Sequence, residues 1–485
     1  MEEIDIATVT KRSIRGIFSL VSRTLVIQII GFIVGNLLLP AFLAPSVYGV
    51  FYVVSAFIGF LTYFSDIGLA AALVQKKEEI TQEDLRTTFS IQQLLVGALV
   101  VLSLIFAEPI SSFYHYGKDG TFLFQALIIA FFLSSLKTIP SVMLERKLLF
   151  NKLVIPQILE TLVFNIVALV LAMNSFGIQS FAYAVLARGM IGLIAIYVIS
   201  PWRVSFGFSR SVAKSLLAFG LPFQVNSFLA LLKDDLLIVY LGKVLPFSQI
   251  GYIGFAQKWA FVSLRLIMDN IIRITFPSFS RLQHDERALS IALEKSLFAS
   301  AFFVFPSVIG LIIVFPYFIH FIPQYHKWEP ALLAMTFFGV NALCSSVSTP
   351  LTNVLNAIGK IRTSLNLMIF WTVATWVLTP LFITWYGFNG VAMVSALVAC
   401  SVIGVVMIVR RSIQLNMARS IGFPAFASIL MGGILYFVTP LIAISMPMLI
   451  VVVALGAILY CGFLYLMARE QIRADILFVI TNLKK

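Results

Sequence analysis

Long apolar runs constrain this chain more than any other feature of its sequence. Fourteen runs follow one another along the 485 residues, and each is roughly the 20 residues that a helix needs to span a bilayer. Hydrophobic residues make up 60% of the chain and charged residues 11%, with a mean hydropathy of +1.01, whereas a soluble domain is about 25% charged. The sequence therefore predicts an all-α, polytopic membrane protein with about 14 transmembrane helices.

The spans alternate with short polar loops. We expect them at residues 17–43, 48–74, 88–108, 121–143, 153–173, 180–200, 214–241, 248–275, 292–316, 329–349, 364–384, 388–409, 423–444 and 447–468. Of the 34 lysines and arginines, 24 fall in the segments that lie inside if the N-terminus is cytoplasmic, and 3 fall in outer loops. Basic residues gather on the cytoplasmic side of membrane proteins. We therefore expect both termini in the cytoplasm, and we read the net charge of +13 as orientation and not as a sign of nucleic-acid binding.

Two halves of the chain resemble each other. Residues 176–182 (FGIQSFA) match residues 386–392 (YGFNGVA) at an offset of 210, which Pro140 and Pro350 share. Residues 46–49 (SVYG) match residues 248–251 (SQIG) at an offset of 202. The alternative is chance similarity between apolar helices, but the markers keep their order and spacing.

The repeat predicts a domain organisation. Six spans would form an N-terminal lobe at residues 1–203, six would form a C-terminal lobe at 204–415, and two extra spans and a tail would occupy 416–485. Because six is even, both lobes keep one orientation, an arrangement that places a cavity between parallel halves in known transporters.

Twelve ionisable residues interrupt the predicted spans. A charge at mid-bilayer costs about 2.5–3.5 kcal/mol even on a lenient scale, so most of them must face a wet cavity, pair or reach the interface. The basic ones are Arg23, Lys137, Arg188, Lys233, Lys258, Arg265 and Arg273, and the acidic ones are Asp66, Glu160, Asp234, Asp235 and Asp269.

The eighth span carries four of these charges on one face. Lys258, Arg265, Asp269 and Arg273 are spaced so that they lie within a sector of roughly 80° at about 100° per residue, and Asp269 can pair with both arginines at i±4. The stripe either lines a lumen or locks helices together as a salt-bridge ladder. Its net positive charge favours a lumen that binds an anion.

Two groups of site residues follow from these positions. As substrate-binding cations of a central cavity we predict Arg265, Lys258, Arg188, Arg273 and Lys137. As coupling or gating residues we predict Asp234, Asp235, Asp269, Asp66 and Glu160, of which Asp234 and Asp235 lie at the depth of Lys258 and either gate or brace the fold by pairing with it.

The sequence shows no motif for nucleotide hydrolysis, metal binding or triad catalysis. The sequence contains no phosphate-binding GxxxxGK[ST] loop, and its four histidines have no partners at metal or triad spacing. We therefore expect no metal, no cofactor and no enzymatic activity. We interpret the inner segment 76–86 as a solvated amphipathic turn and not as a site.

Several segments resemble the polysaccharide exporters of the MATE-like (multidrug/oligosaccharidyl-lipid/polysaccharide) superfamily. They are residues 43–51 (LAPSVYGVF), 64–69 (FSDIGL), 72–75 (ALVQ) and 276–283 (FPSFSRLQ), together with an acidic residue at Asp235. The resemblance implies a MATE-like fold and a flippase that moves a polyprenyl-pyrophosphate-linked, anionic oligosaccharide repeat unit across the bacterial inner membrane. It also implies H⁺ or Na⁺ as coupling ion, contact with membrane lipids, and a polymerase and chain-length proteins as partners.

Three alternatives stay open at this stage. A MATE-type drug or cation antiporter would favour carboxylates over cations in its lumen and would usually have twelve spans. A membrane polymerase would usually show a large polar outer loop, and the outer loops here are short. A transporter of the major facilitator type would show a Gly-x-x-x-Asp-Arg-like signature after its second span, and residues 76–86 contain none.

Overall fold

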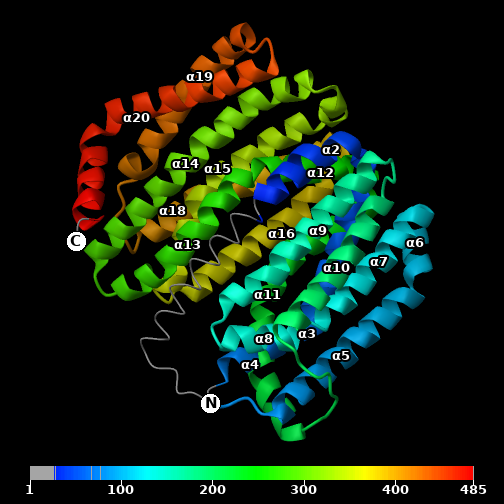
Figure 1. Ribbon diagram of the computed structural model, residues 1–485. Helices are drawn as coiled ribbons and strands as arrows, with labels where there is room; N and C mark the ends of the chain where they lie inside the picture. Colours follow the sequence, from blue (N-terminus) through cyan, green and yellow to red (C-terminus); the bar gives the residue numbers. More distant parts are fainter. Residues whose placement is uncertain (1–26, 28, 67, 77, 484–485) are drawn as a thin grey trace. The chain divides into compact units, whose positions relative to one another are not determined.

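The computed structural model describes residue 27 and residues 29–66, 68–76 and 78–483, without the side chains of residues 66, 219–230, 273–274 and 470–483. Within these ranges the regular structure is helical and contains no strand (Figure 1), which confirms the all-α fold class. Eleven helices among the described residues are long and apolar enough to cross a membrane. The expected total of 14 stays a prediction, because the first, seventh and eighth predicted spans fall partly on residues or side chains that are not described.

The chain divides into two compact units, residues 1–251 and residues 252–485. The lobe boundaries expected from the repeat, at 203/204 and 415/416, stay a prediction. The first unit contains, in chain order, a π-helical turn at Gly31–Leu38, α2 (Leu39–Phe42), α3 (Pro45–Asp66), α4 (Leu69–Gln75), α5 (Gln82–Ile105), α6 (Ala107–Tyr114), α7 (Gly117–Ser135), α8 (Thr138–Arg146), α9 (Phe150–Met173), α10 (Gln179–Ile199), α11 (Arg210–Val244) and the start of α12 (Phe247–Ala260).

The second unit takes up the rest of α12 and continues with helices only. They are α13 (Val262–Leu282), α14 (Glu286–Phe321), a 3₁₀ turn at Pro323–Trp328, α15 (Ala331–Ala357), α16 (Ile361–Tyr386), α17 (Asn389–Ala399), α18 (Val402–Arg410), a π-helical turn at Ala418–Gly422, α19 (Phe423–Ile442) and α20 (Met446–Leu483). The two extra helices α19 and α20 pack on α14 through a core that includes Met431, Leu435 and Tyr460.

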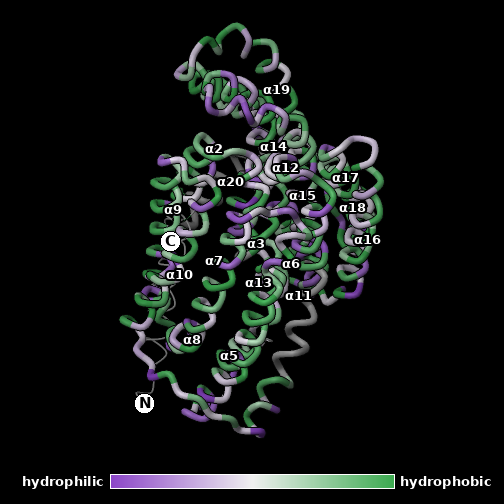
Figure 2. The backbone as a smooth tube through the Cα atoms, turned by 90° about the vertical axis from the view of Figure 1, so that its right-hand side faces the viewer, coloured by the Kyte–Doolittle hydropathy of each residue, from purple (hydrophilic) through white to green (hydrophobic). Residues whose placement is uncertain are grey.

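The helices bury one face and leave another apolar face open. Val198, Leu441 and Leu466 are 76%, 75% and 77% exposed, and hydrophobic residues dominate along α5 and α10 in Figure 2. In water such surfaces would be unfavourable, whereas in a bilayer they face hydrocarbon. The molecule is thus a multi-pass membrane protein.

Four predicted spans are each made of two consecutive helices. Residues 48–74 form α3 and α4, which meet at Gly68 with φ of 73°. Residues 121–143 form α7 and α8, residues 248–275 form α12 and α13, and residues 388–409 form α17 and α18. Apolar run length cannot reveal such interruptions, because a break of one or two residues keeps the run apolar.

Matched turns support the internal repeat. Gly177 and Gly387, 210 residues apart, both take positive φ, at 55° and 58°, a conformation that favours glycine. One residue separates each glycine from the following helix, and α10 and α17 begin at Gln179 and Asn389, at the same offset. The repeat therefore extends to backbone conformation at this position.

The second pair of repeat markers forms one reciprocal contact in the first unit. A Cβ atom on Gly49 in α3 would lie 1.8 Å from the carbonyl oxygen of Phe247, and a Cβ on Gly251 in α12 would lie 1.9 Å from that of Pro45. Each glycine thus receives the backbone of the residue four positions before the other. The starts of α3 and α12 are therefore in backbone contact, and only glycine permits so close an approach.

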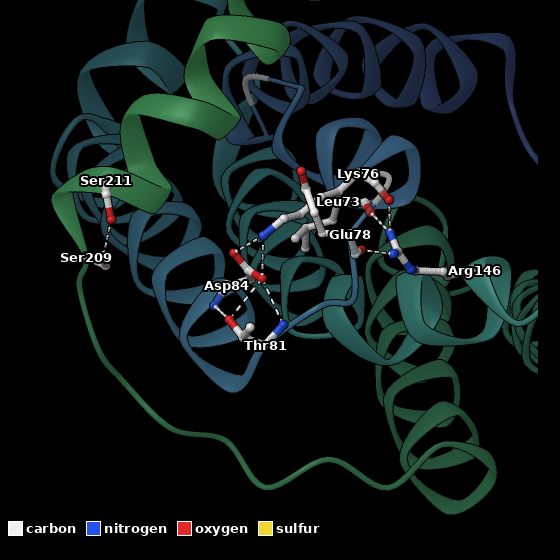
Figure 3. Close-up of polar contacts among 8 residues, drawn as sticks. All are labelled: Leu73, Lys76, Glu78, Thr81, Asp84, Arg146, Ser209 and Ser211. Atoms are coloured by element: carbon white, nitrogen blue, oxygen red, sulfur yellow. Dashed lines mark hydrogen bonds and ion pairs between the residues drawn. The ribbon is translucent and has the colours of Figure 1, made fainter. Parts of the chain in front are cut away.

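The segment between α4 and α5 is ordered by ion pairing and capping (Figure 3). Lys76 Nζ lies 2.8 Å from the Asp84 carboxylate, whose side chain is 1% exposed, and Thr81 and Asp84 form a capping box at the start of α5. The expected solvated, amphipathic character holds, since Glu78, Glu79 and Thr81 are exposed while Asp84 and Leu85 are buried. The sequence did not reveal the ion pair and the capping box that order the segment.

Arg146, at the end of α8, fastens the same segment. Its guanidinium donates to the carbonyl oxygens of Leu73, Lys76 and Glu78 (Figure 3). The first of these carbonyls lies near the end of α4, where a helix leaves its last carbonyls without backbone partners. One basic side chain thus ties α8 to the loop between α4 and α5.

Candidate functional site

The break between α7 and α8 positions the candidate site. Pro140 lies in the first turn of α8 and has no N–H to donate to the carbonyl of Leu136. The hydroxyl of Tyr197 on α10 donates to that carbonyl instead, at 3.1 Å. A proline and a tyrosine from another helix therefore stabilise an interruption inside the membrane-spanning region, a place where broken helices line cavities in transporters.

Two glutamines of α5 brace the same break. Gln92 Nε2 donates to Thr138 Oγ1 at 2.9 Å and Gln93 Nε2 donates to Ser135 Oγ at 3.2 Å. Each bond satisfies polar groups that would be costly to bury alone. Ser135 and Thr138 flank Lys137, so these bonds fix the direction in which the lysine leaves the chain.

Lys137 forms an ion-paired cluster with two charged residues from other helices. Its Nζ lies 2.6 Å from Glu160 Oε1 on α9, and Arg188 Nε on α10 lies 3.6 Å from Glu160 Oε2. The side chains of Lys137 and Glu160 are 16% and 11% exposed, whereas that of Arg188 is 54% exposed. The cluster carries a net positive charge, and Arg188 is its open cation.

A glycine makes room for the carboxylate. A Cβ atom on Gly192 of α10 would lie 2.0 Å from Glu160 Oε1. Gly192 follows Arg188 by four residues, so both lie on one face of α10. On that face, Arg188 contacts the Glu160 carboxylate and the missing side chain of Gly192 leaves space for it.

A polar cavity of about 220 Å³ adjoins the cluster. Three hydroxyl side chains, one amide and the two buried charges contribute to its wall, which is formed by Ser134, Lys137, Thr138, Ser141, Leu153, Pro156, Gln157, Glu160 and Ile196. Hydroxyls and a lysine are donors that suit an anionic or hydroxylated ligand. The cavity lies within the first unit.

The structure thus brings together three of the predicted site residues: Lys137, Arg188 and Glu160. Sequence reasoning missed Gly192, Tyr197, Gln92 and Gln93, which position them. Pro140, inside a predicted span, indicates that the carbonyl of Leu136 lacks its helical N–H partner. The sequence does not show which hydroxyl donates a hydrogen bond to that carbonyl instead.

The charged stripe of the eighth span is arranged differently from the prediction. Lys258 lies in α12 and is half-buried, and Arg265 and Asp269 lie exposed on α13. No ion pair joins the described side chains of Arg265 and Asp269, so the expected i, i+4 pair is absent. Both groups are exposed, and two solvated side chains gain little by pairing. The side chain of Arg273 is outside the described residues.

The acidic residues of α11, Asp234 and Asp235, belong to the first unit. Asp234 is paired with its neighbour Lys233 at 3.7 Å and its side chain is 68% exposed. The carboxylate of Asp235 packs beside Gly59 of α3, at 3.5 Å from the position of a Cβ on that glycine. Pairing of these aspartates with Lys258 stays a prediction, and the side chain of Asp66 is not among those described.

Comparison with known proteins places the chain in a family. Residues 38–333 match the family model described as polysaccharide biosynthesis protein. The succinoglycan biosynthesis transport protein ExoT of Rhizobium meliloti is 22% identical over 467 residues, which cover 90% of this chain and 89% of that protein. The lipopolysaccharide biosynthesis protein WzxC of Escherichia coli is 23% identical over 311 residues, or 64% of this chain and 62% of that protein.

Solved structures agree on the fold. The lipid II flippase MurJ in an inward closed conformation matches with a TM-score of 0.74 at 15% identity, over 94% of this chain and 100% of that one. An inward-facing MATE family multidrug resistance transporter matches with a TM-score of 0.62 at 16% identity, over 80% and 95%. These matches confirm the MATE-like fold. The chain therefore belongs to the polysaccharide biosynthesis protein family and has the fold of the MurJ and MATE transporters.

Proposed function

We propose that the protein is a flippase for a polyprenyl-pyrophosphate-linked oligosaccharide repeat unit. It moves this anionic lipid from the cytoplasmic to the outer leaflet of the bacterial inner membrane, by alternating access through a cationic central cavity, and supplies surface polysaccharide synthesis. Both termini are cytoplasmic in this proposal. The family match and relatives named for succinoglycan transport and lipopolysaccharide biosynthesis support it.

The observation that carries the proposal is the Lys137–Glu160–Arg188 cluster beside the polar cavity. Glu160 compensates the two cations while the site is empty, since an unpaired buried charge is strongly unfavourable. An incoming pyrophosphate competes with Glu160 for Lys137 and Arg188, and arginine offers phosphate a two-pronged contact. The glutamate therefore acts as a stand-in for the ligand and keeps its binding reversible.

Transport needs a driving force, and an H⁺ or Na⁺ gradient supplies it in this proposal. Glu160, Asp66, Asp234, Asp235 and Asp269 are the candidate carriers. The substrate cations are completed by Lys258, Arg265 and Arg273. The protein transports without covalent chemistry and works beside a polymerase and chain-length proteins.

A charge exchange at the cluster tests the proposal. Lys137→Glu alone brings two carboxylates together and Glu160→Lys alone brings three cations together, so both variants lose transport. The double exchange restores an ion pair but moves its cation from the start of α8 to α9, beside Arg188, whose side chain is 54% exposed and can move away. If the pair only braces the helices, the double variant recovers both stability and transport.

We expect the double variant to recover thermal stability while transport stays at least tenfold below the unmodified protein, about 1.4 kcal/mol in free energy. Transport is measured as uptake of a lipid-linked oligosaccharide into the protected leaflet of proteoliposomes. Arg188→Gln, which removes the open cation, is the matched variant and should lower transport with little change in stability. Full transport by both variants contradicts the proposal.

A MATE-type drug or cation antiporter is the alternative function. A cationic substrate needs a carboxylate that is free to pair with it. Glu160 instead contacts two cations already, which favours an anionic substrate. Transport of a cationic dye that depends on Glu160 and is unaffected by Arg188→Gln would support the antiporter instead.

A further inference from the structure

The connection between α10 and α11 is an extended strap, residues 201–209, that is fastened to α5 along one edge. The backbone N–H groups of Gly207 and Ser209 donate to Ser90 Oγ at 3.0 Å and to Thr87 Oγ1 at 3.1 Å. Arg86 Nε donates to Ser205 Oγ at 3.2 Å. Residues 205, 207 and 209 thus lie along α5, and Figure 3 shows where Ser209 leads into α11.

The intervening residues form a largely exposed apolar row along the strap. Side chains alternate along an extended chain, and Val204, Phe206 and Phe208 are 50%, 71% and 70% exposed. Trp202, just before the row, is buried against Phe89 of α5. Phe206 also contacts Phe89, with ring centroids 5.4 Å apart. The strap is therefore held to α5 while half or more of each of its three large apolar side chains remains exposed.

The strap lies near the end of a membrane-spanning helix. Thr87 and Ser90 belong to the first turns of α5, which begins at Gln82, so a rise of about 1.5 Å per residue puts the strap within about 12 Å of that helix end. This is the level of the boundary between headgroups and acyl chains, where exposed phenylalanines find an apolar environment.

The charged residues of the strap itself and of the first turns of α11 are all basic, whereas the first turn of α5 also carries the exposed Glu83. Arg86, Arg203, Arg210 and Lys214 are all exposed, and the sequence contains no aspartate or glutamate between Glu160 and Asp234. Phenylalanines flanked by an excess of cations are the combination that binds anionic lipid surfaces. A zwitterionic surface would satisfy the apolar row but not the four cations.

From this arrangement we infer that the strap is a binding surface for anionic phospholipids. Val204, Phe206 and Phe208 insert at the acyl boundary, and the four basic residues hold the lipid phosphates. In the proposed orientation the lipids belong to the cytoplasmic leaflet. The inference rests on the membrane-spanning fold and stands apart from the choice of transported substrate.

Fluorescence quenching by spin-labelled lipids tests the inference. Phe208→Cys is made in a background without the three native cysteines (C344S/C400S/C461S) and labelled with NBD, and the full-length protein is placed in mixed phosphatidylglycerol and phosphatidylcholine vesicles. We expect quenching several-fold stronger when phosphatidylglycerol carries the spin label than when phosphatidylcholine does. The triple variant R203Q/R210Q/K214Q should reduce this preference to near unity.

A lipid-facing position on α10 is the matched control. Ile194 is 60% exposed, and a label at Ile194→Cys should be quenched equally by both lipids. Equal quenching at position 208, or quenching there by aqueous iodide in place of lipid, overturns the inference. Phe206→Cys provides a second labelled position if the first variant is poorly folded.

Discussion

At the scale of single residues, the cost of charge inside a membrane explains the candidate site. Glu160 sits between Lys137 and Arg188, so the carboxylate and the lysine compensate each other where water is scarce. The sequence predicted each residue individually, since an ionisable group within an apolar run is expensive. It could not predict that they meet, because they come from three helices whose packing depends on the whole fold.

Gly192→Ala tests how tightly the carboxylate is held. The added methyl group would lie 2.0 Å from Glu160 Oε1, and overpacking of this kind costs roughly 1–3 kcal/mol. We expect a lower melting temperature in detergent and reduced transport. Gly97→Ala on α5, where a Cβ meets nothing within 4 Å, should be neutral or slightly stabilising.

A shorter acid should relieve the clash. In the double variant Gly192→Ala/Glu160→Asp the carboxylate is withdrawn by one methylene, so the two changes together should cost less than the sum of their separate costs. Strict additivity of the two melting-temperature shifts would show that Gly192 does not act through Glu160.

At the scale of helices, interruptions carry more information than the helices themselves. The α7–α8 break places Lys137 at the start of α8, with Pro140 and Tyr197 accounting for the carbonyl of Leu136. The positions of most spans followed from the apolar runs, although α14 begins six residues before and α15 ends eight residues after the predicted limits. The breaks inside predicted spans did not follow from them. Breaks depend on side chains of neighbouring helices that replace backbone hydrogen bonds.

Tyr197→Phe should destabilise the protein by about 1–3 kcal/mol, because the Leu136 carbonyl loses its donor in a partly buried place. Pro140→Ala supplies a backbone N–H to the same carbonyl. In the Pro140→Ala background the Tyr197→Phe change should therefore cost much less, as measured by thermal unfolding of single and double variants. An equal cost in both backgrounds would contradict the assignment of this hydrogen bond.

The contact between the starts of α3 and α12 offers a test of alternating access. Gly49→Ala cannot keep the 1.8 Å approach to the Phe247 carbonyl, so the two helix ends must separate. We expect labelling of Ser46→Cys by a membrane-impermeant maleimide, in the cysteine-free background, to rise several-fold from outside the cell. Gly433→Ala, in open space on α19, is the control, and unchanged labelling of Ser46→Cys would argue against closure at this contact.

At the scale of the whole molecule, the sequence was sufficient for class and fold, because hydropathy and the distribution of basic residues act along the entire chain. The internal repeat could also be recognised in the sequence, and the positive φ of both Gly177 and Gly387, at matching positions of the repeat, supports it. The order of the segment between α4 and α5 could not be recognised there, because Arg146, from a helix about 60 residues further along the chain, holds its backbone carbonyls.

Topology is the prediction that belongs to this scale. A fluorescent protein that matures only in the cytoplasm, fused after Lys485, should fluoresce, and an impermeant reagent should label Lys118→Cys and Lys327→Cys from outside but not Lys147→Cys or Lys360→Cys. External labelling of an inner position would invert the assigned orientation.

The reciprocal glycine contact has a consequence for the history of the chain. If the two halves arose by duplication of one gene, the ancestral half would have formed a homodimer. One glycine codon would then have supplied both glycines of this contact, so a single mutation would have changed both. Fusion gave each side its own codon. The present Gly49 and Gly251 can thus change one at a time, which allows selection to loosen one side of the contact while the other stays intact.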